Sequence, residues 1–274
     1  MRVLIVTAVP AERDAVVRGV GATAPELAEL PVPGGMLHRL SPAPPAGPPL
    51  TVDVLAAGVG PTAAAAGTAA ALTAAAVART PYDLAVSAGI GGGFTTARPA
   101  ATTPAATMPA ATTPAAARPA AARLGSVVVA DAIVAADLGA ETPDGFAAVT
   151  DLGFGTVEHL PPAPLVAAVA EATDAVRGTV LTVSTVTGSA ERAAELLRRH
   201  PCAVAEAMEG FGVAEAAAAQ SVPALEVRTV SNAVGPRDRA AWRIGEALEA
   251  LTGAFATIAP LLGTWTFDPE GTRQ

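Results

Sequence analysis

Two carboxylates, an arginine and an amide lie where predicted strands end, and they define the chemistry that the chain could perform. Glu12 follows the first predicted strand, and Glu209 follows Met208 at the end of a later one. Arg228 and Asn232 lie in a β-branched run that gives way to a loop. Because open α/β sheets bind ligands at the edge where strands end, we expect these side chains to converge there.

These residue types favour a site that binds a sugar-containing ligand and activates water. A carboxylate such as Glu209 can accept hydrogen bonds from vicinal hydroxyls, Met208 can pack against an apolar sugar face, and a second carboxylate can take a proton from water. Taken singly, Glu12 and Glu209 are better explained as first-turn helix acids stabilised by the helix dipole. Their convergence with Arg228 and Asn232 shifts the balance towards a site. The amide of Asn232 donates and accepts hydrogen bonds but carries no titratable proton.

Short apolar runs alternate with helical patterns along the chain. The predicted strands cover residues 2–9, 51–57, 84–89, 126–132, 179–186, 203–207 and 224–231. The predicted helices cover residues 11–20, 62–79, 163–176, 190–199, 209–220 and 240–259. This order predicts an α/β fold in three layers, with a central mixed β-sheet flanked by helices on both faces.

Length and composition indicate one domain that spans residues 1–274. The 274 residues are 51% hydrophobic and carry a net charge of -8, which argues against nucleic acid or an anionic membrane as the main partner. None of the 17 basic residues is lysine, which removes Schiff-base chemistry and the P-loop lysine. The single cysteine, Cys202, excludes an intramolecular disulfide and suggests a cytoplasmic protein.

Two apolar stretches raise the question of targeting. The first, residues 3–9, is broken by Pro10 and the charges after it, so we interpret it as a buried strand and not as a signal peptide. The second, residues 54–78, is uncharged but consists mainly of Ala, Gly and Thr, so we expect a strand, a turn and a buried helix in place of a membrane span.

A low-complexity segment interrupts the pattern at residues 95–124. Proline recurs at every fifth position from Pro99 to Pro119, which removes helix hydrogen bonds, and large apolar side chains are rare there. We predict a disordered insertion of Pro, Ala and Thr, with the ordered chain resuming at Gly125. Residues 33–50, rich in Pro and Gly, predict a loop or an edge hairpin.

Two glycine-rich turns invite a nucleotide-binding interpretation. Residues 58–63 match the pattern G-x-G-x-x-A between a strand and a helix, and Asp83 follows at a spacing suited to a ribose contact. Tight strand-to-helix turns need glycine whatever the ligand, and this turn follows the second strand and not the first, so we favour a structural role. The turn at residues 89–93 can offer backbone amides to a ligand.

Six motifs together resemble the nucleoside phosphorylase and nucleosidase superfamily. They are AVPAE (8–12), AGVGPTAAA (57–65), SAGIGGGF (87–94), TVTGS (185–189), AMEGFGVAEA (207–216) and VRTVSN (227–232). Three further stretches are similar to the futalosine hydrolase family: DLGAETPDGF (137–146), DLGFG (151–155) and SNAVGPRDRAAW (231–242). The resemblance covers nearly all of the chain except the insertion.

The resemblance implies roles for Glu12, Met208, Glu209 and Arg228. Glu12 matches the carboxylate that activates water. Met208 and Glu209 match the ribose-binding pair, with Glu209 holding the 2′- and 3′-hydroxyls. Arg228 matches an arginine that orients the nucleophile and the glutamates.

The resemblance also assigns the base side of the site. Ile90 and Gly91 line the sugar and water region, and the backbone near Val186 contacts the base. Asn232 departs from the adenine-specific nucleosidases, which have an aspartate that protonates N7. Hypoxanthine presents two acceptors, N7 and O6, and the NH₂ of Asn232 can donate toward both. We therefore expect a 6-oxopurine leaving group.

The expected function is hydrolysis of the N-glycosidic bond of futalosine, which releases hypoxanthine and dehypoxanthine futalosine in menaquinone biosynthesis. A purine nucleoside phosphorylase or a methylthioadenosine-type nucleosidase is the alternative, and a nucleoside-binding protein without activity is a further one. Nothing in the sequence predicts a metal or an organic cofactor. The expected partner is a small nucleoside, and the resemblance implies a homodimer or higher homo-oligomer.

A few further polar residues were considered as candidates. His38, His159 and His200 are scattered without metal-ligand spacing. Asp137 lies in a family-like stretch without an assignable role. Arg237 fits either a solvated helix start or a partner for the benzoate carboxylate of futalosine.

Overall fold

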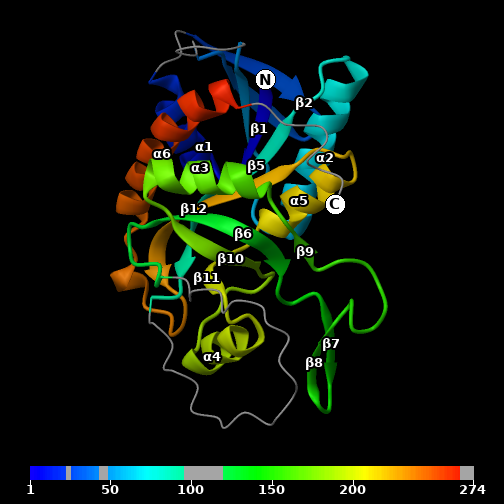
Figure 1. Cartoon of the computed structure of the whole chain (residues 1–274), viewed down its shortest axis with the longest axis vertical. Helices are drawn as coiled ribbons and strands as arrows, with labels where there is room; N and C mark the ends of the chain where they lie inside the picture. Colours follow the sequence, from blue (N-terminus) through cyan, green and yellow to red (C-terminus); the bar gives the residue numbers. More distant parts are fainter. Residues whose placement is uncertain (23–25, 43–48, 96–119, 266–274) are drawn as a thin grey trace.

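The computed structural model describes residues 1–22, 26–42, 49–95 and 120–265, and its strands form one large sheet and a small hairpin (Figure 1). The strands are β1 (Arg2–Thr7), β2 (Leu27–Val32), β3 (Gly35–Leu40), β4 (Thr51–Ala56), β5 (Leu84–Gly93), β6 (Val127–Ala135), β7 (Gly139–Thr142), β8 (Gly145–Ala148), β9 (Glu158–His159), β10 (Val176–Thr182), β11 (Ala203–Ala207) and β12 (Ala224–Ala233). The helices are α1 (Pro10–Gly21), α2 (Pro61–Val77), α3 (Ala163–Thr173), α4 (Ala190–Arg199), α5 (Gly210–Ala218), the short 3₁₀ helix η1 (Arg239–Ala241) and α6 (Ile244–Thr264).

The large sheet closes on itself over part of its width. Its strand order is β11-β10-β6-β12-β5-β1-β4-β3-β2, and β11 also pairs with β5. Strands β5, β12, β6, β10 and β11 therefore form a ring, while β1 to β4 extend from β5 as an open sheet. Within the ring, β12 runs parallel to β5, whereas β11 runs antiparallel to β5.

Helices cover both faces of the open sheet, as the alternating pattern predicted. Apolar residues of α1, α3 and α6 share one core cluster with β1, β4 and β5, among them Val16, Leu165 and Phe255. Helices α2 and α5 pack on the other face through residues such as Leu72 and Val213. Figure 1 shows these two groups on opposite sides of the sheet, with α4 at one end of the molecule. The α/β fold with a mixed central sheet is confirmed.

Most predicted elements are present, and the differences have physical causes. Strand β5 continues to Gly93, four residues beyond its predicted end, because β12 and β11 pair with its glycine run. Strand β10 ends at Thr182, so the predicted residues 183–186 belong to a loop. The edge hairpin expected within 33–50 is formed by β2 and β3, of which β2 lies before the predicted range and β3 within it. The β7–β8 hairpin and the short strand β9 were not predicted.

The low-complexity insertion lies mostly outside the described residues. Of the predicted range 95–124, Thr95 and residues 120–124 are described. Ala122 is completely buried and belongs to the core formed by β6, β10 and α5. The packed chain therefore resumes before Gly125.

Helix α6 is the one helix in the described part of the chain that is long and apolar enough to cross a membrane. It packs instead against the core, where Leu251, Phe255 and Ile258 are completely buried against α1 and the sheet. Its apolar character is therefore explained by core packing.

Candidate active site

Arg228 is the centre of a buried charged cluster. It lies in the middle of β12, its side chain is completely buried, and each of its three nitrogens donates a hydrogen bond. Nε donates to Glu226 Oε1 at 2.9 Å, Nη1 to Glu209 Oε2 at 3.2 Å and Nη2 to Ser87 Oγ at 2.7 Å. The planar guanidinium makes this three-way contact from three separate nitrogens, whereas the donors of a lysine share a single nitrogen.

Glu209 links this arginine to the β4–α2 turn. Its Oε1 accepts a hydrogen bond from the backbone N–H of Gly60, which has a φ of 95° at the start of α2. The glycine-rich turn of residues 58–63 thus holds a carboxylate in place. Asp83, the expected ribose contact of a dinucleotide site, accepts instead from the backbone N–H of Arg2 at the opposite end of the sheet. The dinucleotide interpretation has no support from this geometry.

Glu12 belongs both to a helix start and to the cluster. It lies in the first turn of α1, where Oε2 accepts from the backbone N–H groups of Ala8 and Val9 at 3.0 and 3.2 Å. Its other oxygen, Oε1, accepts from the N–H of Ile90 at 2.9 Å. Burial raises the pKa of Glu12 above its ordinary value, while the Ile90 hydrogen bond and the charge of Arg228 oppose that rise.

Gly89 allows the two charged groups to meet. A Cβ at this position would lie 2.6 Å from Glu12 Oε1 and 2.8 Å from Arg228 Nη1. The two side chains therefore approach the same point of β5 from α1 and from β12. Any larger residue at position 89 would displace at least one of them.

The strand register explains why distant parts of the sequence meet here. Arg228 pairs with Gly89 on β5, and Asn232 pairs with Gly92 after a bulge near Ser231. Strand β11 is antiparallel to β5, and its Glu206 pairs with Gly92. The residues after Glu206 therefore lie progressively closer to Gly89, which places Glu209 near Arg228. The site thus lies beside the carboxyl ends of the parallel strands β1 and β4, as expected, but midway along the longer strands β5 and β12, where the ring closes.

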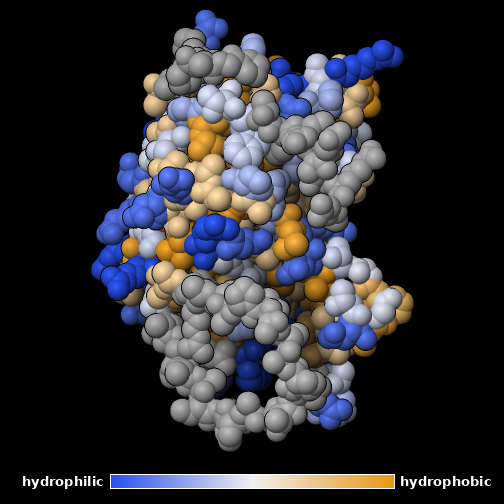
Figure 2. All heavy atoms as spheres, in the orientation of Figure 1, coloured by the Kyte–Doolittle hydropathy of each residue, from blue (hydrophilic) through white to orange (hydrophobic). Residues whose placement is uncertain are grey.

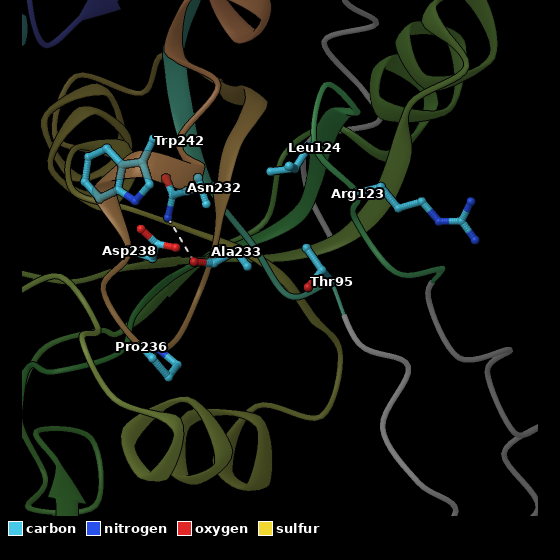
Figure 3. Close-up of a pocket in the computed structure, with 9 residues that line it drawn as sticks. Thr95, Arg123, Leu124, Asn232, Ala233, Pro236, Asp238 and Trp242 are labelled. Atoms are coloured by element: carbon cyan, nitrogen blue, oxygen red, sulfur yellow. Dashed lines mark hydrogen bonds between the residues drawn. The ribbon is translucent and has the colours of Figure 1, made fainter.

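Asn232 lies further along β12 and lines a pocket of about 500 Å³ together with Leu124, Pro236, Asp238 and Trp242, among others (Figure 3). Its Oδ1 accepts from the hydroxyl of Ser231 at 2.9 Å, and its Nδ2 donates to the carbonyl of its neighbour Ala233 at 3.0 Å. One amide hydrogen remains for a ligand. Asn232 can therefore donate to both N7 and O6 of a base only if the Ala233 bond is given up.

The loop that carries Val186 is held by two acidic residues. Asp137 accepts from the backbone N–H of Ser184 at 2.6 Å. Glu206, which is buried on β11, accepts from the backbone N–H of Thr187 at 2.9 Å and from its hydroxyl. Val186 lies between these anchors with 42% of its surface exposed. The loop is fixed at its backbone and open at its side chain.

The remaining predicted residues surround the cluster. Met208, directly before Glu209, is half-buried. Ile90, whose backbone N–H donates to Glu12, is also half-buried. Gly91 is buried, and a Cβ there would lie 2.9 Å from the carbonyl oxygen of Glu206. These contacts bring Glu12, Glu209 and Arg228 together, with Ile90 and Gly91 beside them, while Asn232 lies four residues further along β12 and Val186 lies on a separate loop.

Sequence reasoning missed three groups that complete the cluster. Glu226 is completely buried, and Ser87 and the backbone N–H of Gly60 supply further contacts. Glu226 was detectable, because residues two apart on a strand share a face and a glutamate in a buried apolar strand needs a partner. Ser87 and Gly60 carried no comparable signal.

The other candidate residues make contacts outside the Arg228 cluster. Arg237 and Arg239 lie with their guanidinium carbons 5.5 and 5.9 Å from the ring centre of Trp242. Asp238 accepts from the N–H of Ala240 and caps η1, as expected of a helix start. The three histidines lie on or beside separate elements, and His159 contacts Glu215 at 2.7 Å.

Comparison with known proteins places the chain in a family. A family model described as the phosphorylase superfamily matches residues 50–260. The chain is 61% identical over 265 residues to a futalosine hydrolase of Streptomyces coelicolor, covering 97% of this chain and 98% of that protein. It is 41% identical to a futalosine hydrolase of Acidothermus cellulolyticus, covering 98% and 93% of the two chains.

Solved structures share the fold at low identity. A 5′-methylthioadenosine/S-adenosylhomocysteine nucleosidase from Neisseria meningitidis, in complex with methylthio-immucillin-A, aligns with a TM-score of 0.69 at 16% identity, covering 96% of this chain and 99% of that one. A futalosine hydrolase mutant from Helicobacter pylori aligns with a TM-score of 0.68 at 17% identity, covering 95% and 98%. The chain therefore belongs to the phosphorylase superfamily and, within it, to the futalosine hydrolase family.

Proposed function

We infer that the chain hydrolyses the N-glycosidic bond of futalosine and releases hypoxanthine, a step of menaquinone biosynthesis. The observation that carries this inference is the 61% identity to a futalosine hydrolase over 97% of the chain. The geometry of the cluster supplies a chemical basis, because carboxylates surround a single arginine where a sugar and a water molecule could be held.

Water is the nucleophile that the charge of the cluster favours. Glu12 and Glu209 both lie against Arg228, and Glu226 adds a third carboxylate behind it. Phosphate would meet more negative than positive charge here, whereas water needs only an acceptor. Glu12 is the group we assign to that task, since its oxygens are fixed by three backbone N–H groups and its raised pKa makes it a stronger base than an exposed glutamate.

Glu209 and Met208 are the residues we assign to the ribose. Glu209 is held by Gly60 and Arg228, which leaves the remaining lone pairs of its carboxylate for the 2′- and 3′-hydroxyls. Met208 is only half-buried and can cover an apolar face of the sugar. Arg228 would orient Glu209 together with the water.

The base is assigned to Asn232 and to the backbone near Val186. Oδ1 of Asn232 already accepts from the Ser231 hydroxyl and Nδ2 already donates to the Ala233 carbonyl, and we assign the second hydrogen of Nδ2 to the base. A donor directed at the 6-position suits the O6 acceptor of hypoxanthine, whereas adenine presents an amino group there; N7 accepts in both bases. Asn232 has no acidic proton, so departure of the base would depend on hydrogen bonding to N7.

The pocket beyond Asn232 is a candidate for the far end of the substrate. Trp242 lines it, and the guanidinium of Arg237 lies near the indole ring. An aromatic carboxylate could stack on the indole and pair with this cation. Loss of affinity for futalosine in Arg237→Ala, with unchanged affinity for inosine, would support this assignment.

We further propose a cytoplasmic homo-oligomer. The loop between β8 and β9 projects from the body and carries apolar surface (Figures 1 and 2), and 45% of Leu152 and 69% of Phe154 are exposed. Such apolar exposure suits a contact with a second subunit. The free thiol of Cys202 suits a reducing compartment.

The deciding experiment is a substrate panel with and without phosphate. We expect futalosine to release hypoxanthine at the same rate in both conditions, with methylthioadenosine cleaved far more slowly. Base release that requires phosphate would identify a phosphorylase, and preferential release of adenine would identify a methylthioadenosine-type nucleosidase. A stable complex without base release would identify a binding protein.

The role of Asn232 has its own test. Asn232→Asp should shift the kcat/KM ratio toward 6-amino purines, because a protonated aspartate can donate to N7 and accept from the amino group. The comparison of inosine with adenosine in both variants measures that ratio directly. An unchanged ratio would remove Asn232 from base selection.

A further inference from the structure

Glu226 is a buried carboxylate that the proposed mechanism does not use. It lies two residues before Arg228 on β12, so both side chains lie on the same face of the strand. Both are completely buried. A glutamate in such surroundings costs stability unless it is paired, so its presence calls for an explanation.

The two oxygens of Glu226 have very different surroundings. Oε1 accepts from Arg228 Nε at 2.9 Å. Oε2 is buried and has no hydrogen-bond partner among the described residues. The carboxyl group lies against Gly210, the first residue of α5, where a Cβ would come within 2.2 Å of Oε2. Glycine at 210 thus makes room for a carboxylate with one unsatisfied oxygen.

This contact determines how the guanidinium is oriented. With Nε bound to Glu226 and Nη2 bound to Ser87, the plane of the group is fixed from two sides. Nη1 is then directed toward Glu209 and toward Gly89, beside which the carboxylate of Glu12 also lies. The position of the arginine nitrogen next to the reacting groups is therefore set by residues that lie behind it.

Charge adds a second effect. The charged groups that act on Glu226 are Arg228 on its own strand and Glu209 at the start of α5, and Glu12 on α1 lies on the far side of Arg228. One positive charge is thus shared by three carboxylates. Because the negative charge of Glu226 offsets part of the positive charge of Arg228, the ionised form of Glu12 is stabilised less.

We propose that Glu226 is a positioning residue whose carboxylate orients Arg228 and withholds part of its positive charge from Glu12, and so keeps Glu12 basic. The proposal rests on the inferred role of Glu12 as the base. It assigns Glu226 no contact with the substrate. Its effect is transmitted through one guanidinium.

Two variants separate orientation from charge. Glu226→Gln keeps an oxygen that accepts from Nε but removes the negative charge. We expect the acid limb of the pH profile of kcat/KM to move about one unit to lower pH, because Glu12 then has more of the charge of Arg228. Glu226→Leu removes the acceptor as well, and should lower kcat a further ten- to a hundredfold, roughly the effect of a lost hydrogen bond to a charged group.

The matched control is Glu195→Gln, which removes a carboxylate bound to Arg199 on α4, away from the cluster. Its acid limb should coincide with that of the wild-type protein. The proposal is overturned if Glu226→Gln leaves the acid limb in place, or if Glu226→Leu is as active as Glu226→Gln. If the leucine variant does not fold, the pH profile of the glutamine variant still decides. Failure of the proposed function would appear separately, as normal turnover in Glu12→Gln.

Discussion

Two buried arginine–carboxylate clusters occupy different ends of the sheet, and their charge balance differs in sign. In the Asp53 cluster, the completely buried carboxylate of Asp53 accepts two hydrogen bonds from Arg39 at 2.7 Å, one from Arg2 and one from Tyr82. In the Arg228 cluster, a single guanidinium serves Glu12, Glu209 and Glu226. The first has cations in excess and the second has carboxylates in excess.

The difference separates stability from function. Both oxygens of Asp53 are satisfied, and the two arginines are partly exposed, so little electrostatic cost remains. In the Arg228 cluster, burial raises the pKa of Glu12 and of Glu226, and one oxygen of Glu226 has no partner among the described residues. A cluster that served stability alone would be better neutralised. We infer that the excess of carboxylates is retained for reactivity.

The largest effect is expected for Glu12→Gln. It should lower kcat/KM by about 10²- to 10⁴-fold, since general-base assistance is lost while the amide retains similar size. Steady-state hydrolysis of futalosine measures the change, and a thermal unfolding curve checks that the fold is intact. Near-wild-type turnover would contradict the assignment of the base.

Conservative arginine replacement in the two clusters gives a direct comparison. Arg228→Lys should reduce kcat/KM by roughly ten- to a hundredfold, because lysine cannot reproduce three directed hydrogen bonds. Arg39→Lys, in the Asp53 cluster, should leave kcat/KM unchanged. Equal losses in both variants would mean that the clusters do not differ in function.

Removing the charge of Asp53 should affect stability alone. Asp53→Asn is expected to lower the free energy of unfolding by roughly 1.5–3 kcal/mol, since it weakens hydrogen bonds from two charged groups. Denaturant titration measures this change, and activity per folded molecule should be preserved. A fall in kcat at full folding would show coupling between the two ends of the sheet.

The smallest effect concerns the wild-type pH profile. Because the pKa of Glu12 is raised, the ionised base is present only above that raised value, and activity should increase with pH through an acid limb that lies above the ordinary range of glutamate. The limb should be absent from the residual activity of Glu12→Gln. A limb at the usual glutamate value would indicate that burial has little effect on this residue.

The sequence predicted the layers of the fold and the residues of the cluster better than it predicted how they meet. Periodicity identified β11 at the correct residues and α4 without error. It could not identify the pairing of β11 with β5, because closure of a strand ring depends on contacts distant in sequence. The resemblance supplied Glu12, Glu209 and Arg228, and Glu226 was detectable from its spacing to Arg228, but Ser87 is recognisable only once Arg228 is seen to need partners on every nitrogen.

Strand β5 also limits how far the groups of the site can move relative to one another. It contributes the N–H that holds Glu12, pairs with Arg228 at Gly89 and pairs with Asn232 at Gly92. One backbone therefore serves as the common reference for the base, the arginine and the amide. Fluctuations of the outer loops and helices can alter the path by which a substrate enters, while the spacing among the three groups stays constant. Amide hydrogen exchange in residues 87–92 should accordingly be among the slowest in the protein.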